Sequence, residues 1–452
     1  ANTGNKFNNA LIFTSAGNTA IKNSLASKLG ASSITGTLKL TTGGKISQTG
    51  AVVVTSDTEF DAITNLSSYA IDLSSDNNFG GKVKATKASD IKLKDINDLS
   101  LDAITLVAGA TAPQGNINVT ANKIVLNGDL NSSAATTKNI TLTGNVEVAS
   151  NTTIDAGTDA TAGAISFTGT TNSNDLIAKN LTLIGGAITF TGDVGNLPNQ
   201  KLGDFTITST GVVTFADIKA KSFEVTKANS FIAVDINTTG ADSALAAGEA
   251  GGDIVITAGS ISLNSVDTSG GKSTAATGDH AGGNAGDITL TANSSSVSKT
   301  ITINGDIFAK GESGVGAGSN GNAGEVTLEL ADSTIAGRIN LNLNKFLSSS
   351  VAVVGSAHAG DTLKLTDGKN NWSITAANAG NVKEVDNQAN FPLISFSGFE
   401  NIIGGSNVDN FVIGAAGAVT SIRCGTGSNT LTGRNVSNTL DITGNNQGAV
   451  KQ

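Results

Sequence analysis

The residues of this 452-residue sequence best suited to bind a metal lie in GGSNVDNFVIG, at 404–414. Calcium β-rolls repeat the pattern GGxGxDxUx, whose paired turns supply carboxylate and carbonyl oxygens. Asp409 is the sole carboxylate of this segment, whereas Ca²⁺ takes about six to eight oxygen ligands. The pattern therefore favours a neutral turn held by Asx side chains, with calcium binding as the weaker alternative. The later turns carry uncharged residues, namely Ser428, Asn429, Ser437 and Asn438.

Three other side chains could take part in acid–base or nucleophilic chemistry. His280 follows Asp279, and His358 precedes Asp361 by three residues, so each could form a His–Asp general base. Neither segment carries a serine or cysteine nucleophile motif, and Cys424 has no local partner that would indicate a dyad. We interpret all three as buried or half-buried bystanders.

The acidic and aromatic residues do not form the pattern of a polysaccharide-cleaving β-helix. Such enzymes gather carboxylates or basic residues on one exposed sheet face, often with aromatic platforms for sugars. Here the sequence has one tryptophan, Trp372, and one tyrosine, Tyr69, which are far apart. Trp372 aligns with Leu440 of a later repeat, which marks a core position. We therefore predict no catalytic residues and no enzyme activity, with a polysaccharide-acting enzyme as a minor alternative. The acidic residues are scattered over turns, at Asp129, Asp193, Asp253, Asp287 and Asp306.

The amino-acid composition predicts that the secondary structure consists mainly of β-strands. Charged residues make up 14% and aromatic residues 4%, while the hydrophobic share is 38% and is mostly small or β-branched. This composition suits many short strands with thin core layers better than helices or a disordered chain. The net charge of −9 argues against a nucleic-acid partner. No apolar run is long enough to span a bilayer as a helix, so we expect no transmembrane segment.

Short strands with alternating apolar residues recur throughout the sequence. In 115–130, alternation places Ile117, Val119, Ile124 and Leu126 on one face. Strands of this length at short, regular spacing indicate an all-β protein.

A longer period separates a solenoid from a sandwich or barrel. GGDIVITA (251–258), AGDITLTA (285–292) and AGEVTLEL (323–330) begin 34 and 38 residues apart, with Gly-rich stretches at 272–286 and 312–324 between them. A recurring strand–turn–strand–loop predicts coils of a right-handed parallel β-helix, or β-solenoid, with Gly-rich loop insertions. The Asp in each AGD or GGD segment is expected to close its turn, and the Gly to permit positive φ.

Both ends of the chain differ from this middle part, which spans 91–336. Residues 1–90 are expected to form an N-terminal cap and irregular first coils, with short helical turns in 7–30 and from Ser56 or Asp57 through Phe60 to Ile63. Residues 337–452 are expected to form a C-terminal β-helix segment with a 68-residue repeat whose second copy is incomplete. In that repeat, Ile374 aligns with Ile442, and the last strand of 437–452 is expected to be an open rung.

Several of these segments resemble large secreted adhesins of Gram-negative bacteria related to filamentous haemagglutinin. GGNAGDITLTA (282–292) and SISLNSVDTSGG (260–271) are similar to the β-helical coils of that family, and FENIIGGSNVDNFVIG (399–414) is similar to its degenerate calcium-type repeats. The resemblance covers 250–452 well and 100–230 only in style. The NPNG-type secretion module of two-partner adhesins is absent near Ala1.

These observations predict a secreted, non-catalytic protein on a bacterial cell surface. Its partner would be a receptor or glycan on a host or neighbouring cell. The alternative is a subunit of a self-assembling extracellular filament, sheath or surface layer, joined end to end through open β-helix ends. The sequence opens on Ala1 and contains no Met, so we expect either a mature form that has lost a leader or a segment of a longer protein.

Overall fold

The computed structural model describes residues 5–64, 67–107, 115–134, 138–174, 177–295, 298–332, 334–365, 368–386, 391–434, 439–444 and 447–451. The chain divides into two compact units, residues 1–220 and 221–452. The sequence pattern predicts boundaries near 90 and 336, and these stay predictions. Across the described residues the regular elements are all β-strands.

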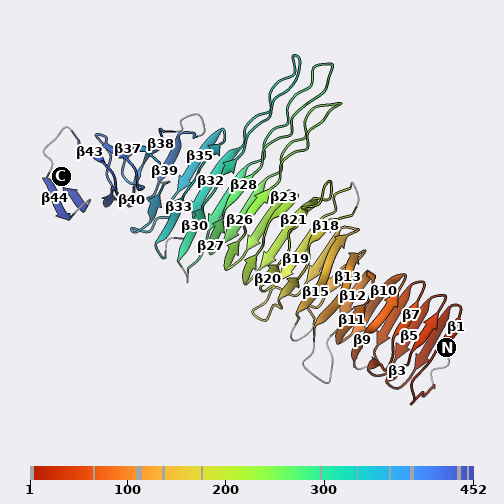
Figure 1. Cartoon of the computed structure of the whole chain (residues 1–452). Helices are drawn as coiled ribbons and strands as arrows, with labels where there is room; N and C mark the ends of the chain where they lie inside the picture. The colour runs from red at the N-terminus through yellow and green to blue at the C-terminus, as the bar shows by residue number, and fades with distance from the viewer. Residues whose placement is uncertain are drawn as a thin grey trace. The chain divides into compact units, whose positions relative to one another are not determined.

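The strands of the first unit are short and follow one another closely along the chain (Figure 1). They are β1 (Thr14–Ala16), β2 (Thr19–Asn23), β3 (Ser27–Leu29), β4 (Ser32–Ile34), β5 (Leu38–Thr42), β6 (Ile46–Gln48), β7 (Val52–Val54), β8 (Thr58–Ala62), β9 (Ala70–Phe79), β10 (Lys82–Ala88), β11 (Asp90–Asp95), β12 (Asp98–Leu106), β13 (Ile117–Leu126), β14 (Leu130–Asn131), β15 (Ile140–Val148), β16 (Thr152–Asp155), β17 (Ile165–Phe167), β18 (Thr171–Ser173), β19 (Leu181–Gly185), β20 (Ile188–Phe190), β21 (Leu202–Ser209) and β22 (Val212–Thr214).

The second unit contains the remaining strands. They are β23 (Ile218–Lys227), which starts at the end of the first unit, β24 (Ser230–Ile232), β25 (Asp235–Asn237), β26 (Ile254–Ala258), β27 (Ser260–Leu263), β28 (Ser265–Asp267), β29 (Ile288–Ala292), β30 (Lys299–Ile303), β31 (Ile307–Phe308), β32 (Glu325–Leu330), β33 (Gly337–Leu341), β34 (Phe346–Leu347), β35 (Ser350–Val354), β36 (Thr362–Lys364), β37 (Asn370–Ala376), β38 (Ala379–Glu384), β39 (Ile394–Ser397), β40 (Asn401–Ile403), β41 (Asp409–Ile413), β42 (Ser421–Arg423), β43 (Thr430–Thr432), β44 (Thr439–Gly444) and β45 (Gln447–Lys451).

Strands in the first unit pair in parallel with a strand of the next coil, which in most pairs is not the neighbouring strand in sequence. β5 pairs with β8, which sets Leu38 beside Thr58. The same rule sets Ile117 beside Ile140 and Ile140 beside Ile165, in β13, β15 and β17. Parallel pairing between successive coils is the defining feature of a solenoid, so the fold is all-β and β-solenoid-like, as the sequence predicts.

The helical turn expected at residues 56–63 is a strand. Its central residues form β8, which is hydrogen-bonded to β5 in parallel, and Phe60 is fully buried in the core. The spacing of Phe60 and Ile63 fits one helical turn, but pairing with the previous coil satisfies the backbone groups of the strand and decides the outcome. Residues 14–29 likewise form β1 to β3, where helical turns were expected in 7–30.

The apolar residues of alternate positions fill the core. Ile117, Val119, Ile124 and Leu126 are all at most 1% exposed, which confirms the face assigned from the alternation. Larger side chains stack on their equivalents in successive coils as well. Phe167 and Phe190 are parallel with ring centroids 4.0 Å apart, and such contacts add to the burial free energy of each ring.

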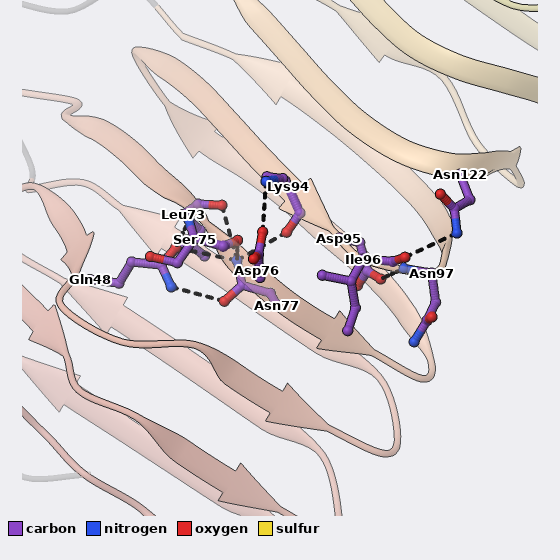
Figure 2. Close-up of polar contacts among 10 residues, drawn as sticks. All are labelled: Gln48, Leu73, Ser75, Asp76, Asn77, Lys94, Asp95, Ile96, Asn97 and Asn122. Carbon is purple, nitrogen blue, oxygen red and sulfur yellow. Dashed lines mark hydrogen bonds and ion pairs between the residues drawn. The ribbon is translucent and has the colours of Figure 1, made fainter.

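Polar side chains occupy the corners where the chain turns between strands of the first unit. Asn77 is completely buried, and its amide donates to the carbonyl oxygen of Lys94 at 3.0 Å and accepts from Gln48 Nε2 at 2.8 Å (Figure 2). Asp95, directly beside Asn77 in the next coil, accepts a hydrogen bond from the Phe79 backbone N–H at 2.7 Å. These side chains bond the backbone groups that a bend leaves without a ladder partner.

In the second unit, the AGD and GGD segments act between coils. The Asp253 carboxylate accepts from the Asp287 backbone N–H, one coil further on, at 2.8 Å. Asp287 in turn accepts from the Glu325 N–H at 2.8 Å. A β-carbon on Gly252 would overlap the Lys221 carbonyl oxygen, and the φ of Gly252 is not positive. The glycine is therefore needed for close approach of two coils, which corrects the turn-closing role expected for these residues.

An antiparallel hairpin interrupts the parallel pattern in the second unit. β37 and β38 pair with each other in antiparallel register, and β37 also pairs in parallel with β41. Trp372 of β37 is 1% exposed and stacks on Phe411 at 5.7 Å, so the core position inferred from its alignment is confirmed.

The 68-residue offset found in the sequence relates this hairpin to a second one. Ile374 pairs with Gly380 in the first hairpin, and Ile442 pairs with Gly448 in β44 and β45. The segment expected to be an open parallel rung is thus an antiparallel pair. The side chains of β44 and β45 lie outside the described residues.

Candidate functional site

Three Gly-rich loops extend from one side of the second unit (Figure 1). Residues 238–253 connect β25 to β26, residues 268–287 connect β28 to β29, and residues 309–324 connect β31 to β32. The strands before the loops pair in parallel, and so do the strands after them. Both ends of each loop are therefore held in register with the next loop. We call these three loops the fin.

The first half of each loop leads away from the solenoid and is called its outgoing arm. The outgoing arms of successive loops are hydrogen-bonded to one another through their backbones. Gly240 N–H donates to the Ser269 carbonyl at 2.9 Å, and Gly270 N–H donates to the Lys310 carbonyl at 3.0 Å. These bonds continue the coil-to-coil pairing of β25, β28 and β31 outward, beyond the solenoid.

The second half of each loop leads back to the solenoid and is called its returning arm. The returning arms of successive loops are hydrogen-bonded to one another at every third residue. Gly248 N–H donates to Ala281 O at 3.0 Å, and Gly251 N–H donates to Asn284 O at 2.8 Å. A three-residue spacing between equivalent groups is the period of a polyproline II helix, which has no internal hydrogen bonds and leaves its backbone groups free to bond neighbours. The next pair of arms repeats the spacing, with Gly282 bonded to Ser319 and Ala285 bonded to Asn322, each at 2.9 Å.

Further bonds join the outgoing arms to the returning arms. Gly271 N–H donates to Glu249 O at 2.7 Å, and Gly283 N–H donates to Gly271 O at 2.8 Å. A β-carbon on either glycine would overlap a carbonyl oxygen of an adjacent arm, that of Ala241 or Glu249. Only glycine fits these interior positions. The fin is thus a two-layered bundle of extended Gly-rich arms, held rigidly by its own backbone.

The tips of the fin expose the side chains that a partner would meet first. Leu245 is 89% exposed, the highest value among the large apolar residues of the described chain. In the next two loops, His280 and Val315 form an antiparallel bridge through their backbones. Tight reversals follow from positive φ at Gly278 (93°) and Gly316 (62°).

The two histidines and the cysteine lie in three different places. Asp279, which could have formed a pair with His280, accepts from the Ala317 N–H at 2.7 Å. Near His358, the Asp361 carboxylate is completely buried and accepts from the Gly337 N–H. Cys424 is half-buried, and burial raises the pKa of its thiol, which disfavours the nucleophilic thiolate.

The structure also reveals a buried cation that the sequence reasoning overlooked. Lys299 is completely buried, and its Nζ donates to the carbonyls of Ala331 and Asp332 and to Ser356 Oγ at 3.2 Å. Ser356 Oγ donates to Asp361 Oδ2 at 2.6 Å. All three ammonium donors are used, so Lys299 is arranged as a structural cation and not as a base for Ser356. Its alternation with Ile301 and Ile303 was the signal for an inward position.

Asp409, the residue singled out for calcium, is completely buried. Its Oδ1 accepts from Asn370 Nδ2 at 2.8 Å and its Oδ2 from the Gly405 N–H at 2.7 Å. Burial raises the pKa of the Asp409 carboxyl, and these hydrogen bonds oppose that change. Asn429 of the later turn accepts from the Asp409 N–H at 2.8 Å, whereas Ser437 and Asn438 lie outside the described residues. These contacts give Asp409 a structural role, in which its side chain joins the turn at Gly405 to Asn370. Across the part of the chain that the structure describes, no three His, Cys, Asp or Glu residues cluster as a metal site.

Comparison with known proteins gives one match. Residues 16–86 match a family described as repeats of unknown function (DUF5649). They include the regular first coils from β2 to β9. No curated protein and no solved structure matches the chain. Within the described residues, no helix has the length and apolar character needed to cross a membrane.

Proposed function

We propose that this repeat protein is a secreted, non-catalytic adhesin that acts as a rigid rod on a bacterial cell surface. The solenoid, for which we retain the right-handed β-helix of the sequence prediction, would hold the fin away from the cell. The fin would contact a receptor or glycan on a host or neighbouring cell. The resemblance of 250–452 to secreted adhesins supports the same role.

The fin is the observation that carries this proposal. Loops of such composition would be flexible if they were isolated, and a flexible loop loses conformational entropy when it binds. Here the arms are hydrogen-bonded to one another, so their conformational entropy is already lost on folding and not on binding. A preorganised projection that presents Leu245 at its tip is suited to binding, because little further order has to be gained.

The first residues of the three loops add a polar surface at the base of the fin. A shallow groove runs across the three loops and is lined by charges of both signs, including Asp242, Lys272, Lys310 and Glu312. Lys310 and Glu312 form an ion pair at 3.0 Å. Mixed charges of this kind favour a partner with both donors and acceptors over a uniformly charged one.

A fin-less variant tests the proposal. Each loop would be cut back to a short turn that keeps β25–β26, β28–β29 and β31–β32 in place, and a second variant would carry only Leu245→Ser. Binding to cultured cells and to immobilised extracellular matrix would be measured for both. We expect the fin-less protein to lose binding, and Leu245→Ser to weaken it, with far-UV circular dichroism unchanged.

Two results would count against the proposal. Equal binding by the fin-less and native proteins would show that the fin is not the adhesive surface. Long fibres in electron micrographs of the purified protein would favour the filament alternative, whereas discrete particles would exclude it.

A further inference from the structure

A second surface of the second unit carries unpaired positive charge. Arg338, Lys364 and Arg423 lie on one sheet face, although the whole chain has a net charge of −9. The sequence contains three arginines, and two of them line the same hollow. The third, Arg434, donates to the carbonyl of Gly417.

Strand register places these side chains together. β33, β36, β40 and β42 are successive parallel rungs, in which Arg338 lies beside Thr362, Thr362 beside Asn401, and Asn401 beside Ser421. The adjacent column places Lys364 and Arg423 on either side of Ile403. We call this surface the cationic face.

No ion pair neutralises the cationic face within the described residues. Arg338 and Arg423 are exposed and Lys364 is half-buried, and none of the three lies within ion-pair distance of a described carboxylate. Some exposed lysines of the first unit are paired, as Lys39 is with Glu59 at 2.8 Å, whereas others such as Lys22 are not paired with a described carboxylate. The cationic face is distinguished by the clustering of three unpaired cations on successive rungs of one sheet face.

The nearest carboxylates behind this face are engaged in the interior. Asp361 is completely buried and accepts from Gly337 N–H and Ser356. Glu400 is 7% exposed, and its two oxygens accept from Asn378 Nδ2 and the Asp361 N–H. The described residues that line the two hollows of the face include no acidic side chain.

Rung spacing sets the size of a matching ligand. Parallel strands lie about 4.8 Å apart, so Lys364 and Arg423, two rungs apart, are separated by about 10 Å along the stack. Arg338 extends the face by one more rung. A ligand with anionic groups about 10 Å apart could therefore engage two cations at once.

We propose that the cationic face binds an acidic oligosaccharide, through carboxylate or sulfate groups on its sugar units. Arginine forms bidentate, charge-assisted hydrogen bonds with such groups. Between the cations, Thr362 and Ser421 offer hydroxyl groups to the sugar, and Ser421 is held by its 2.6 Å bond to Asn401 Oδ1. A nucleic acid is a poorer fit because a long polyanion would meet the negative charge of the rest of the chain.

This inference rests on the proposed adhesive function, since the glycan would be a receptor of the adhesin, but it concerns a site separate from the fin. The two therefore fail independently. Loss of cell binding in the fin-less variant with retained glycan binding would leave the cationic face intact, and the reverse result would leave the fin intact.

The test measures binding of the full chain to defined probes by biolayer interferometry. The probes are oligogalacturonate, a sulfated heparin-derived oligosaccharide, and a neutral galactan as the uncharged control. The variants are Arg338→Gln/Arg423→Gln and Lys364→Gln, with Lys227→Gln as a control that removes one exposed positive charge from another strand of the same unit.

We expect an acidic oligosaccharide to bind and the neutral galactan not to bind. The double arginine variant should weaken binding by about 100-fold, at roughly tenfold for each arginine, Lys364→Gln should weaken it less, and Lys227→Gln should leave it unchanged. Preference for carboxylated or sulfated sugar identifies the anionic group. Unchanged binding in the double variant, or equal binding of duplex DNA or polyglutamate, would overturn the proposal.

Discussion

The substitution Gly283→Ala should open the fin locally without unfolding the solenoid. A β-carbon at this position would lie closer to the Glu249 carbonyl oxygen than the 3.0 Å that real β-carbons respect. The arms must therefore separate, and three backbone bonds meet at this point. They are Gly271 N–H to Glu249 O (2.7 Å), Gly283 N–H to Gly271 O (2.8 Å) and Glu312 N–H to Gly283 O (3.1 Å).

The expected size follows from these bonds. Each net intramolecular hydrogen bond contributes about 0.5–1.5 kcal/mol, so weakening three of them costs about 2–4 kcal/mol of local stability. That loss corresponds to a reduction of about 30- to 700-fold in the protection of the amides involved. Native-state hydrogen exchange resolved by residue would measure it at Gly271, position 283 and Glu312.

The solenoid itself should be unaffected, because repeat proteins are stabilised by contacts between adjacent coils. The denaturation midpoint should therefore change little. The matched control is Gly17→Ala, where a β-carbon would meet no atom within 4 Å; it should leave all amide protection unchanged. Protection at Gly271 and Glu312 that stays within about twofold of the native value in Gly283→Ala would refute the bundle described for the fin.

Three further predictions concern the two solenoid units. Asn77→Ala should lower the free energy of unfolding of the first unit by about 2–4 kcal/mol, because buried partners lose their hydrogen bonds. Asp76→Ala, which breaks only an exposed ion pair with Lys94, should lower it by less than about 1 kcal/mol. Urea denaturation would compare the two variants, and equal losses would contradict the corner role of Asn77. The Lys138 ammonium lowers the pKa of Asp159 to about 2 from its ordinary 3.8. The stability that this ion pair contributes is present above the unfolded pKa of Asp159 and is lost as pH falls from about 5 towards 2. Asp159→Asn should therefore flatten that part of a stability–pH curve, and an unaltered curve would argue against the pair. Trp372, the single tryptophan, is buried, so its fluorescence should have a short emission wavelength that shifts to the red on unfolding. Trp372→Phe should lower the free energy of unfolding far less than Trp372→Ala, for which a loss of about 3–5 kcal/mol is expected. Similar losses for the two variants in thermal denaturation would show that the ring is not packed as described.

The repeating coils could be predicted from the sequence because their signal is local. Alternation alone placed Ile117, Val119, Ile124 and Leu126 on the buried face. The same alternation marks Lys299 as inward, but a lysine at such a position contradicts its usual preference for solvent. Its partners, Ser356 and the carbonyl of Ala331, come from later in the chain, so the compensation cannot be read from the strand itself.

Other features depend on which coils become neighbours. The helical spacing of Phe60 and Ile63 is real, but strand pairing with β5 prevails over it. Gly252 was explained by a turn, whereas the structure shows an approach of another coil that has no local signature. The cationic face belongs to the same class, because Arg338 and Arg423 are brought together only by the register of four successive rungs.

The fin also bears on the resistance of the protein to proteolysis. Gly-rich loops with lysines are common cleavage sites when they are unstructured. A protease must draw several residues of its substrate into its own cleft with their backbone groups free. At Lys272, however, the N–H is bonded to Asp242 Oδ1 at 2.7 Å and the carbonyl accepts from Ser243 N–H at 2.9 Å. The loops that project furthest from the second unit are therefore protected from cleavage for as long as their arms remain bonded.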